Sequence, residues 1–139
     1  MRRFWTAYAG AAVGMLVLDI PWLSIAGPRL YTPLMGHLLR PDFVVWAAVA
    51  FYLIYVAGIV ILAVRPGATS SPAAVIGRAA VYGFCAYATY DLTNLATLKD
   101  FPVVIVAADL LWGTFLSSVA AAVAFWSMRR FGGPAPGPR

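Results

Sequence analysis

The chain has 139 residues, of which 63% are hydrophobic and 11% are charged, and its net charge is +5. Soluble domains carry about 25% charged residues, so this composition indicates a membrane protein. The basic residues flank apolar runs instead of forming a patch, so we expect no nucleic acid as a partner. Because Cys85 is the only cysteine, an intrachain disulfide and a cysteine metal cluster are both excluded.

Four segments are apolar enough to cross a bilayer, which takes about 20 residues. We place these spans at about 4–26, 43–64, 74–98 and 103–128. They predict an all-α, polytopic membrane protein in which a four-transmembrane-helix bundle forms one domain over residues 1–130. The run after the basic N-terminus is long and lacks a clean cleavage site, so we expect a retained span instead of a cleaved signal peptide. The Pro/Gly-rich tail, residues 131–139, is expected to be disordered.

The first connection, residues 27–42, is rich in helix-breaking residues. It holds Gly27, Pro28, Pro33 and Pro41, so we expect the first helix to end near residue 26. The connection is long enough for a short helix at the membrane surface. The sequence leaves open whether it is a lid over the residues below it or only a connector.

Basic residues predict the orientation, because they accumulate on the cytoplasmic side of a membrane protein. Seven fall on the side of the two termini: Arg2, Arg3, Arg65, Arg78, Arg129, Arg130 and Arg139. Three fall on the opposite side: Arg29, Arg40 and Lys99. This imbalance predicts that both termini lie in the cytoplasm and argues against a dual-topology protein.

Three of the five acidic residues lie inside predicted spans: Asp19, Asp91 and Asp109. A carboxylate inside a bilayer costs several kcal/mol unless it is protonated, paired or hydrated. Counting about 1.5 Å per residue from the span ends places all three roughly 10 Å below the outer surface. We therefore predict one polar layer in the outer half of the bundle. Because like charges placed together disfavour ionisation, we expect at least one of these carboxyl groups to carry a proton.

Two of the aspartates share an Asp-x-x-Trp pattern, which joins Asp19 to Trp22 and Asp109 to Trp112. Pro21 lies inside the first of these motifs and frees a backbone carbonyl one turn earlier. The sequence leaves open whether this proline shapes a cavity or is only a structural kink. The two tryptophans are candidates for the lining of an apolar slot.

Asp91 lies among other polar residues on the third span. Tyr87 and Asn94 share its helical face and Thr93 flanks it, so all three are candidate neutral ligands. Lys99 lies about two turns above and is a candidate partner, although an interfacial anchor is the simpler interpretation. A carboxylate with these neighbours favours a ligand-binding or ion-binding site.

Rows of small residues predict close helix packing. On the fourth span, Gly113, Ser117 and Ala121 recur at intervals of four, and Gly10 and Gly14 do so on the first. Small residues at this spacing let two backbones approach closely in a membrane. The aspartates could then form a buried hydrogen-bond network that only holds the helices together, which is the structural alternative to a functional site.

Several stretches are specific enough to compare with known families. They are AYATYDLTNLATLKDFP at 86–102, FYLIYVAGI at 51–59 and the two Asp-x-x-Trp motifs. Together they resemble the DUF2177 family of bacterial membrane proteins, over nearly the whole chain except the tail. Phe101 departs from the pattern, in which a tryptophan is expected. The resemblance implies a small four-span protein of the bacterial inner membrane and names no activity.

Three functional hypotheses remain. In the first, the aspartates bind or translocate a proton, a cation, or a small amine or lipid-like solute, since oxygen ligands suit protons, Mg²⁺, Ca²⁺ and amines. Four spans are few for a solitary transporter, so a homo-oligomer is then expected. In the second, paired carboxylates catalyse a reaction on a lipid or isoprenoid. In the third, the chain is an accessory subunit of a larger membrane complex.

No cofactor is expected from the sequence. His37 is the only histidine and lies outside the spans, and no zinc, haem or phosphate-binding motif is present. The lipid bilayer is the one partner that the composition requires. Catalytic and metal-binding residues are therefore left unassigned.

Overall fold

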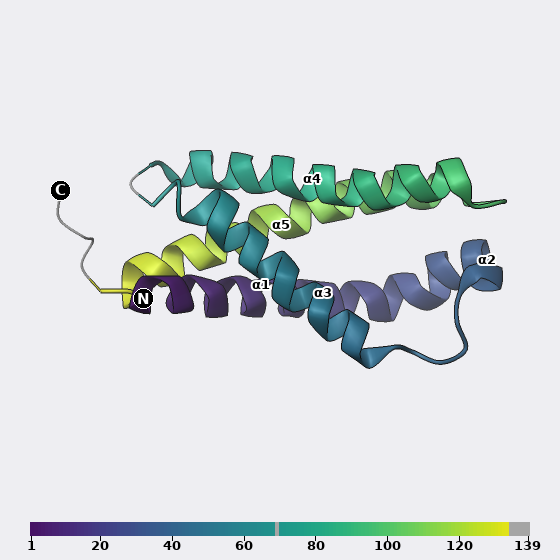
Figure 1. Cartoon of the computed structure of the whole chain (residues 1–139), viewed down its shortest axis with the longest axis horizontal. Helices are drawn as coiled ribbons and strands as arrows, with labels where there is room; N and C mark the ends of the chain where they lie inside the picture. The colour runs from purple at the N-terminus through teal and green to yellow at the C-terminus, as the bar shows by residue number, and fades with distance from the viewer. Residues whose placement is uncertain (69, 134–139) are drawn as a thin grey trace.

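All regular structure in the described part of the chain, residues 1–68 and 70–133, is helical in this computed structural model. The elements in chain order are α1 (Arg2–Ala26), η1 (Gly27–Tyr31), α2 (Thr32–Met35), η2 (Gly36–Leu38), α3 (Val45–Gly58), η3 (Ile59–Val64), α4 (Pro72–Thr97) and α5 (Val103–Phe131). α1 and α5 run antiparallel along most of the molecule, and α4 lies along α5 (Figure 1). This arrangement confirms the predicted all-helical class.

Among the described residues, three helical runs are long and apolar enough to cross a membrane: Arg2–Leu38, Val45–Val64 and Val103–Phe131. α4 is long enough too, with 26 residues, but its polar residues lower its hydropathy. It therefore stays a predicted span. Phe131, placed by the sequence at the start of the tail, is the last residue of α5. The predicted disorder of residues 134–139 lies outside the described residues.

The α-helix α1 ends at Ala26, where the sequence predicts the end of the first span, but the helical path does not stop there. Gly27 keeps helical dihedral angles, and the helix continues through η1, α2 and η2 as far as Leu38. A proline in a helix lacks one N–H and clashes with a carbonyl one turn earlier. η1 absorbs Pro28 by widening to a π-helical turn, in which the N–H of Thr32 donates to the carbonyl of Gly27.

The core lies where α1, η3 and α4 pack around α5. Small residues allow close approach: a Cβ added to Gly10 would lie 2.8 Å from the Cβ of Ser127. On the other side of α5, a Cβ on Gly83 would collide with Ser117 and with the carbonyl of Gly113. Both small-residue rows predicted from the sequence therefore lie at helix contacts.

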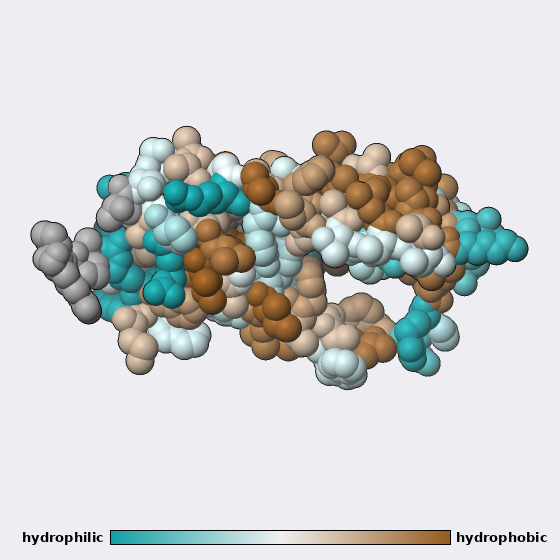
Figure 2. All heavy atoms as spheres, turned by 45° about the horizontal axis from the view of Figure 1, so that its top comes forward, coloured by the Kyte–Doolittle hydropathy of each residue, from teal (hydrophilic) through white to brown (hydrophobic). Residues whose placement is uncertain are grey.

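α3 diverges from this core. Four residues of its continuation η3 are buried, namely Ile59, Val60, Ala63 and Val64. By contrast, Trp46 and Ile54 on α3 are 76% and 71% exposed. Figure 1 shows α3 crossing the other helices obliquely, and Figure 2 shows a hollow toward the end of the molecule where α3 begins. Hydrophobic residues cover much of the surface between two hydrophilic ends (Figure 2), as a bilayer requires.

Segment 30–35 packs over the turn between α4 and α5. Met35 from α2 joins Phe101, Ile105 and Val106 in a second apolar cluster, to which Tyr31 adds its ring. Residues 27–38, which we call the helical extension, are thereby fixed against the beginning of α5. It therefore helps to wall the space beneath it instead of lying free at the surface.

We predict that Gly83→Ala destabilises the fold by about 1–3 kcal/mol, because the added methyl group meets α5 backbone that cannot move aside. Gly77→Ala, on the same helix, is the matched control. Its added Cβ meets nothing within 4 Å, so the better helix propensity of alanine should leave stability equal or slightly higher. Thermal unfolding in detergent, followed by circular dichroism, checks the difference; equal stability of the two variants would contradict the packing.

Candidate functional site

The two Asp-x-x-Trp motifs form one connected unit. In each motif the tryptophan lies three residues after the aspartate, about 4.5 Å farther along the helix axis. Because α1 and α5 are antiparallel, this displacement brings each tryptophan toward the aspartate on the other helix. The indole N–H of Trp112 donates to Asp19 at 3.0 Å, and the indole N–H of Trp22 donates to the hydroxyl of Tyr31 at 3.2 Å. Tyr31 in turn donates to Asp109. Trp112 of the second motif therefore bonds the aspartate of the first motif directly, and Trp22 of the first is linked to the aspartate of the second through Tyr31.

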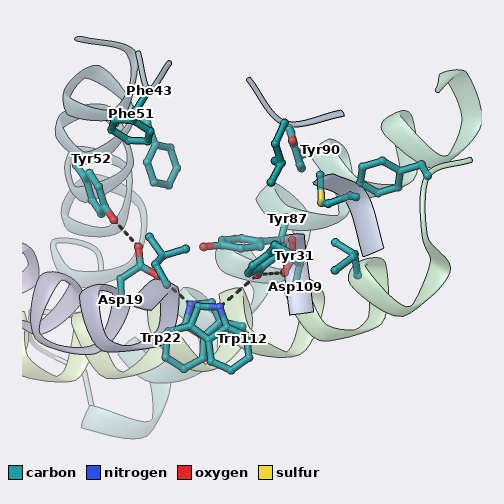
Figure 3. Close-up of a pocket in the computed structure, with 16 residues that line it drawn as sticks. Asp19, Trp22, Tyr31, Phe43, Phe51, Tyr52, Tyr87, Tyr90, Asp109 and Trp112 are labelled. Atoms are coloured by element: carbon teal, nitrogen blue, oxygen red, sulfur yellow. Dashed lines mark hydrogen bonds between the residues drawn. The ribbon is translucent and has the colours of Figure 1, made fainter. Parts of the chain in front are cut away.

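The two tryptophans hold this unit together by stacking. Their ring centroids are 4.4 Å apart and the ring planes are 11° from parallel. The stack lies between the carboxyl groups of Asp19 and Asp109, as Figure 3 shows. Figure 3 shows the two aspartates offset along the helices, and their common depth in the membrane stays a prediction.

Two hydroxyl donors from outside α1 and α5 complete the network. Tyr52 on α3 donates to Asp19 at 2.5 Å, and Tyr31 reaches Asp109 from the helical extension. Asp19 and Asp109 are 5% and 8% exposed. A buried carboxylate needs such donors to offset the loss of water. Both aspartates receive them from aromatic side chains.

These residues enclose a pocket of about 480 Å³. Its lining comes from α1, the helical extension, α3, α4, α5 and their connections: Asp19, Trp22, Leu23, Tyr31, Met35, Leu39, Phe43, Ala48, Phe51, Tyr52, Tyr87, Tyr90, Phe101, Ile105, Asp109 and Trp112. Figure 3 shows the carboxylates on one side and Phe43, Phe51 and Tyr90 on the other. None of the described residues that line the pocket is Lys, Arg or His. Within this part of the chain, the pocket is acidic at its base and aromatic at its mouth.

Glycine at position 113 makes room for one wall of the pocket. A Cβ there would collide with the ring of Tyr87 from α4. Tyr87 thereby lies flat against α5 and presents its ring between the two carboxylates (Figure 3). The small-residue row of α5 thus shapes the site as well as the packing.

Asp91 lies behind the pocket instead of in its wall. It is 0% exposed, and neither carboxylate oxygen accepts a hydrogen bond from a described donor. Its neighbour is the carboxyl group of Asp109, which lies within hydrogen-bonding reach when one of the two carries a proton. The pair therefore couples a pocket residue to a fully buried one.

The other sequence candidates on α4 lie apart from the pocket. Asn94 is half-buried and does not line it, and Lys99 is exposed on the turn after the helix. Thr93 is exposed, and its hydroxyl donates to the carbonyl of Tyr90 at 2.9 Å. Among residues 1–68 and 70–133, no group of three or more His, Cys, Asp or Glu is arranged to hold a metal ion. The three aspartates therefore do not form a common metal-binding set.

Sequence reasoning missed two of the principal donors, Tyr31 and Tyr52. Tyr31 lies in a segment rich in helix breakers, which hid the continuation of α1. Tyr52 lies one turn from Tyr55 on a span without charges, where its contact with Asp19 depends on how α3 crosses α1. A tyrosine in an otherwise apolar span was the available signal, since a buried hydroxyl requires a partner.

Comparison with known proteins gives one result. A family described as "Predicted membrane protein (DUF2177)" matches residues 4–126, which include every residue of the pocket. The chain belongs to the DUF2177 family. No curated protein and no solved structure matches the chain. The family description supports a membrane protein and names no ligand, so the function must be argued from the pocket.

We predict that Trp112→Phe lowers the free energy of unfolding by about 2 kcal/mol, because it removes an N–H donor from a buried carboxylate while keeping an aromatic ring in the stack. Trp126→Phe, on the exposed side of the same helix, should change it by less than about 0.5 kcal/mol. Denaturant unfolding in detergent measures both values. The network would be refuted if the two substitutions cost the same.

Proposed function

We propose that the protein binds an organic cation in the carboxylate pocket and carries it through the membrane. The observation behind this proposal is the pairing of Asp19 and Asp109 at the base of a pocket whose described lining contains no basic side chain. Negative charge held in a low-dielectric space attracts a cation strongly. Aromatic donors hold both carboxyl groups in place and bring no positive charge to them. A cation supplied by a ligand is the missing counter-charge.

The pocket favours an organic cation over a metal ion. Its volume of about 480 Å³ lies in the range of pockets that bind drug-sized molecules. A divalent ion would need several oxygen ligands around one point, and no such cluster is present within the described residues. Aromatic rings such as Phe51, Tyr87 and Tyr90 suit an ammonium group or its apolar substituents. The ligand class is therefore an amine or quaternary ammonium with an apolar body.

The hollow beside α3 supports entry from the bilayer. Phe43 and Phe51 lie at the open side of the pocket, and Phe43 is 79% exposed. An amphiphilic cation could place its apolar body between α3 and α4 while its charged group reaches the carboxylates. Such a solute partitions into the membrane first, which raises its local concentration.

We further propose four spans with both termini in the cytoplasm of a bacterial inner membrane, in one domain that acts as a homo-oligomer. The distribution of arginines supports this orientation, as does their separation in the fold: Arg3 bonds Gly133 at the end of the molecule where α1 begins and α5 ends. Lys99 lies at the opposite end, on the turn between α4 and α5. The pocket would then lie nearer the outer face.

The enzyme hypothesis receives less support. A lipid or isoprenoid phosphate would call for a basic side chain near the carboxylates, and the described lining holds none. Asp91 and Asp109 could exchange a proton, but nothing beside them would grip a phosphorylated substrate. The binding hypothesis uses the same residues and needs no further group.

The proposed orientation predicts which turns face outward. In a Cys85→Ser background, Lys99→Cys should react with a membrane-impermeant maleimide added to intact cells, and Ser70→Cys should not. Both positions lie in turns between helices, at opposite ends of α4. Labelling of both after permeabilisation is the control. Preferential labelling of Ser70→Cys in intact cells would reverse the topology.

The binding proposal predicts that the purified protein binds benzyltrimethylammonium, measured by isothermal titration calorimetry in detergent. Asp19→Asn and Asp109→Asn should each weaken this binding at least tenfold, about 1.4 kcal/mol, because each removes one charge facing the ligand. Neopentylbenzene has the same shape without the charge, so its affinity should be the same for the wild type and for both variants.

Asp100→Asn is the matched control for charge removal. Asp100 lies on the exposed turn after α4 with φ of 59°, a conformation that asparagine adopts readily. Removing the charge of Asp100 should leave the affinity for benzyltrimethylammonium unchanged. Equal affinity of the cation for wild type, Asp19→Asn and Asp109→Asn would refute the proposed function.

A further inference from the structure

Asp91 has no role in the pocket wall, yet its burial is complete. It lies in the last third of α4, and both of its oxygens are enclosed without a described donor. An ionised carboxylate without partners or water is strongly disfavoured in such a place. A protonated carboxyl group, by contrast, is neutral and can donate one hydrogen bond. Its neighbour Asp109 is the acceptor within reach.

Asp109 is the pocket-facing member of this pair. It accepts a hydrogen bond from Tyr31 on one oxygen, which leaves its remaining acceptor capacity for Asp91. The other titratable groups facing it are Asp19 across the tryptophan stack and Tyr87 from α4. All are acidic or neutral, so no described positive charge stabilises a second ionised carboxylate here. Two adjacent carboxyl groups in such a site share one proton.

We infer that the Asp91–Asp109 pair stores one proton and releases it when an organic cation occupies the pocket, so that the protein exchanges protons for its solute. This inference rests on the proposed cation binding and adds a coupling mechanism to it. The incoming positive charge replaces the proton as the counter-charge. The O–H bond of the pair breaks, and the proton leaves through the pocket that Asp109 lines. One positive charge enters and one leaves, so the net charge of the site is unchanged.

Asp19 does not store a second proton in this scheme. It accepts hydrogen bonds from Tyr52 at 2.5 Å and from Trp112 at 3.0 Å. Both of its carboxylate oxygens therefore have a donor from a neighbouring helix. Asp91 has none. The different surroundings of these two buried aspartates therefore assign them different roles. Asp19 is held by two donors so that it faces the ligand, and the Asp91–Asp109 pair holds the exchangeable proton.

The test counts protons released by purified, full-length protein in weakly buffered detergent as benzyltrimethylammonium is added. This probe keeps its charge at every pH, so any released proton comes from the protein. The wild type should release about one proton per bound cation near the pH where the pair titrates. Asp91→Asn should bind the cation and release none, since asparagine keeps the shape and the hydrogen-bond donor but holds no exchangeable proton. Asp100→Asn should release protons as the wild type does.

A second measurement needs no variant. If one proton leaves for each cation bound, wild-type affinity must rise about tenfold per pH unit over that range, by thermodynamic linkage. Cation binding by the wild type without proton release and without this pH dependence would overturn the inference while leaving the proposed binding function intact. Proton release that persists undiminished in a folded Asp91→Asn protein would overturn the assignment to this pair. Absence of cation binding to the wild type would overturn both proposals.

Discussion

The exchange of tryptophans between antiparallel α1 and α5 is the contact on which the site depends. A carboxylate withdrawn from water must find donors, and a single helix cannot supply them from its own backbone, which is already bonded. With Asp and Trp three residues apart on each of two antiparallel helices, Trp112 reaches Asp19 and Trp22 reaches the donor of Asp109. The stacked rings then lock the register of the helices. The same tryptophan contact therefore joins α1 to α5 and positions the two aspartates of the proposed binding site.

The shape of the pocket follows from this contact. α1 and α5 approach closely because small residues face each other, so the aromatic stack forms a firm base. α3 meets α1 through Tyr52 and α5 through Tyr55, and it diverges toward its beginning, which opens the side where Phe43 and Phe51 lie. The result is a pair of buried carboxyl groups in the core and an apolar opening beside α3. In the proposed exchange, Asp91, which lies behind Asp109, makes no contact with the ligand but gives up a proton when the ligand binds.

The sequence predicted the helical class, the polar positions and the small-residue contacts, because composition, burial cost and four-residue spacing are local properties. It did not predict the course of residues 27–38. Proline and glycine indicate a helix end on average, yet here a π-helical turn absorbs Pro28 and delivers Tyr31 to Asp109. It also did not predict the tryptophan stack between Asp19 and Asp109 or the isolation of Asp91. These depend on the rotation of each helix about its axis, which spacing along one helix does not determine.

The central claim is that Asp19 and Asp109 together hold the charged group of an organic cation above the tryptophan stack. The most direct measurement is an experimental structure with the arsenic analogue of benzyltrimethylammonium, because arsenic can be located by its anomalous scattering. We predict one anomalous peak inside the pocket, between the two carboxylates and against the face of Tyr87. A peak outside the pocket, or no peak at saturating ligand, would contradict the account.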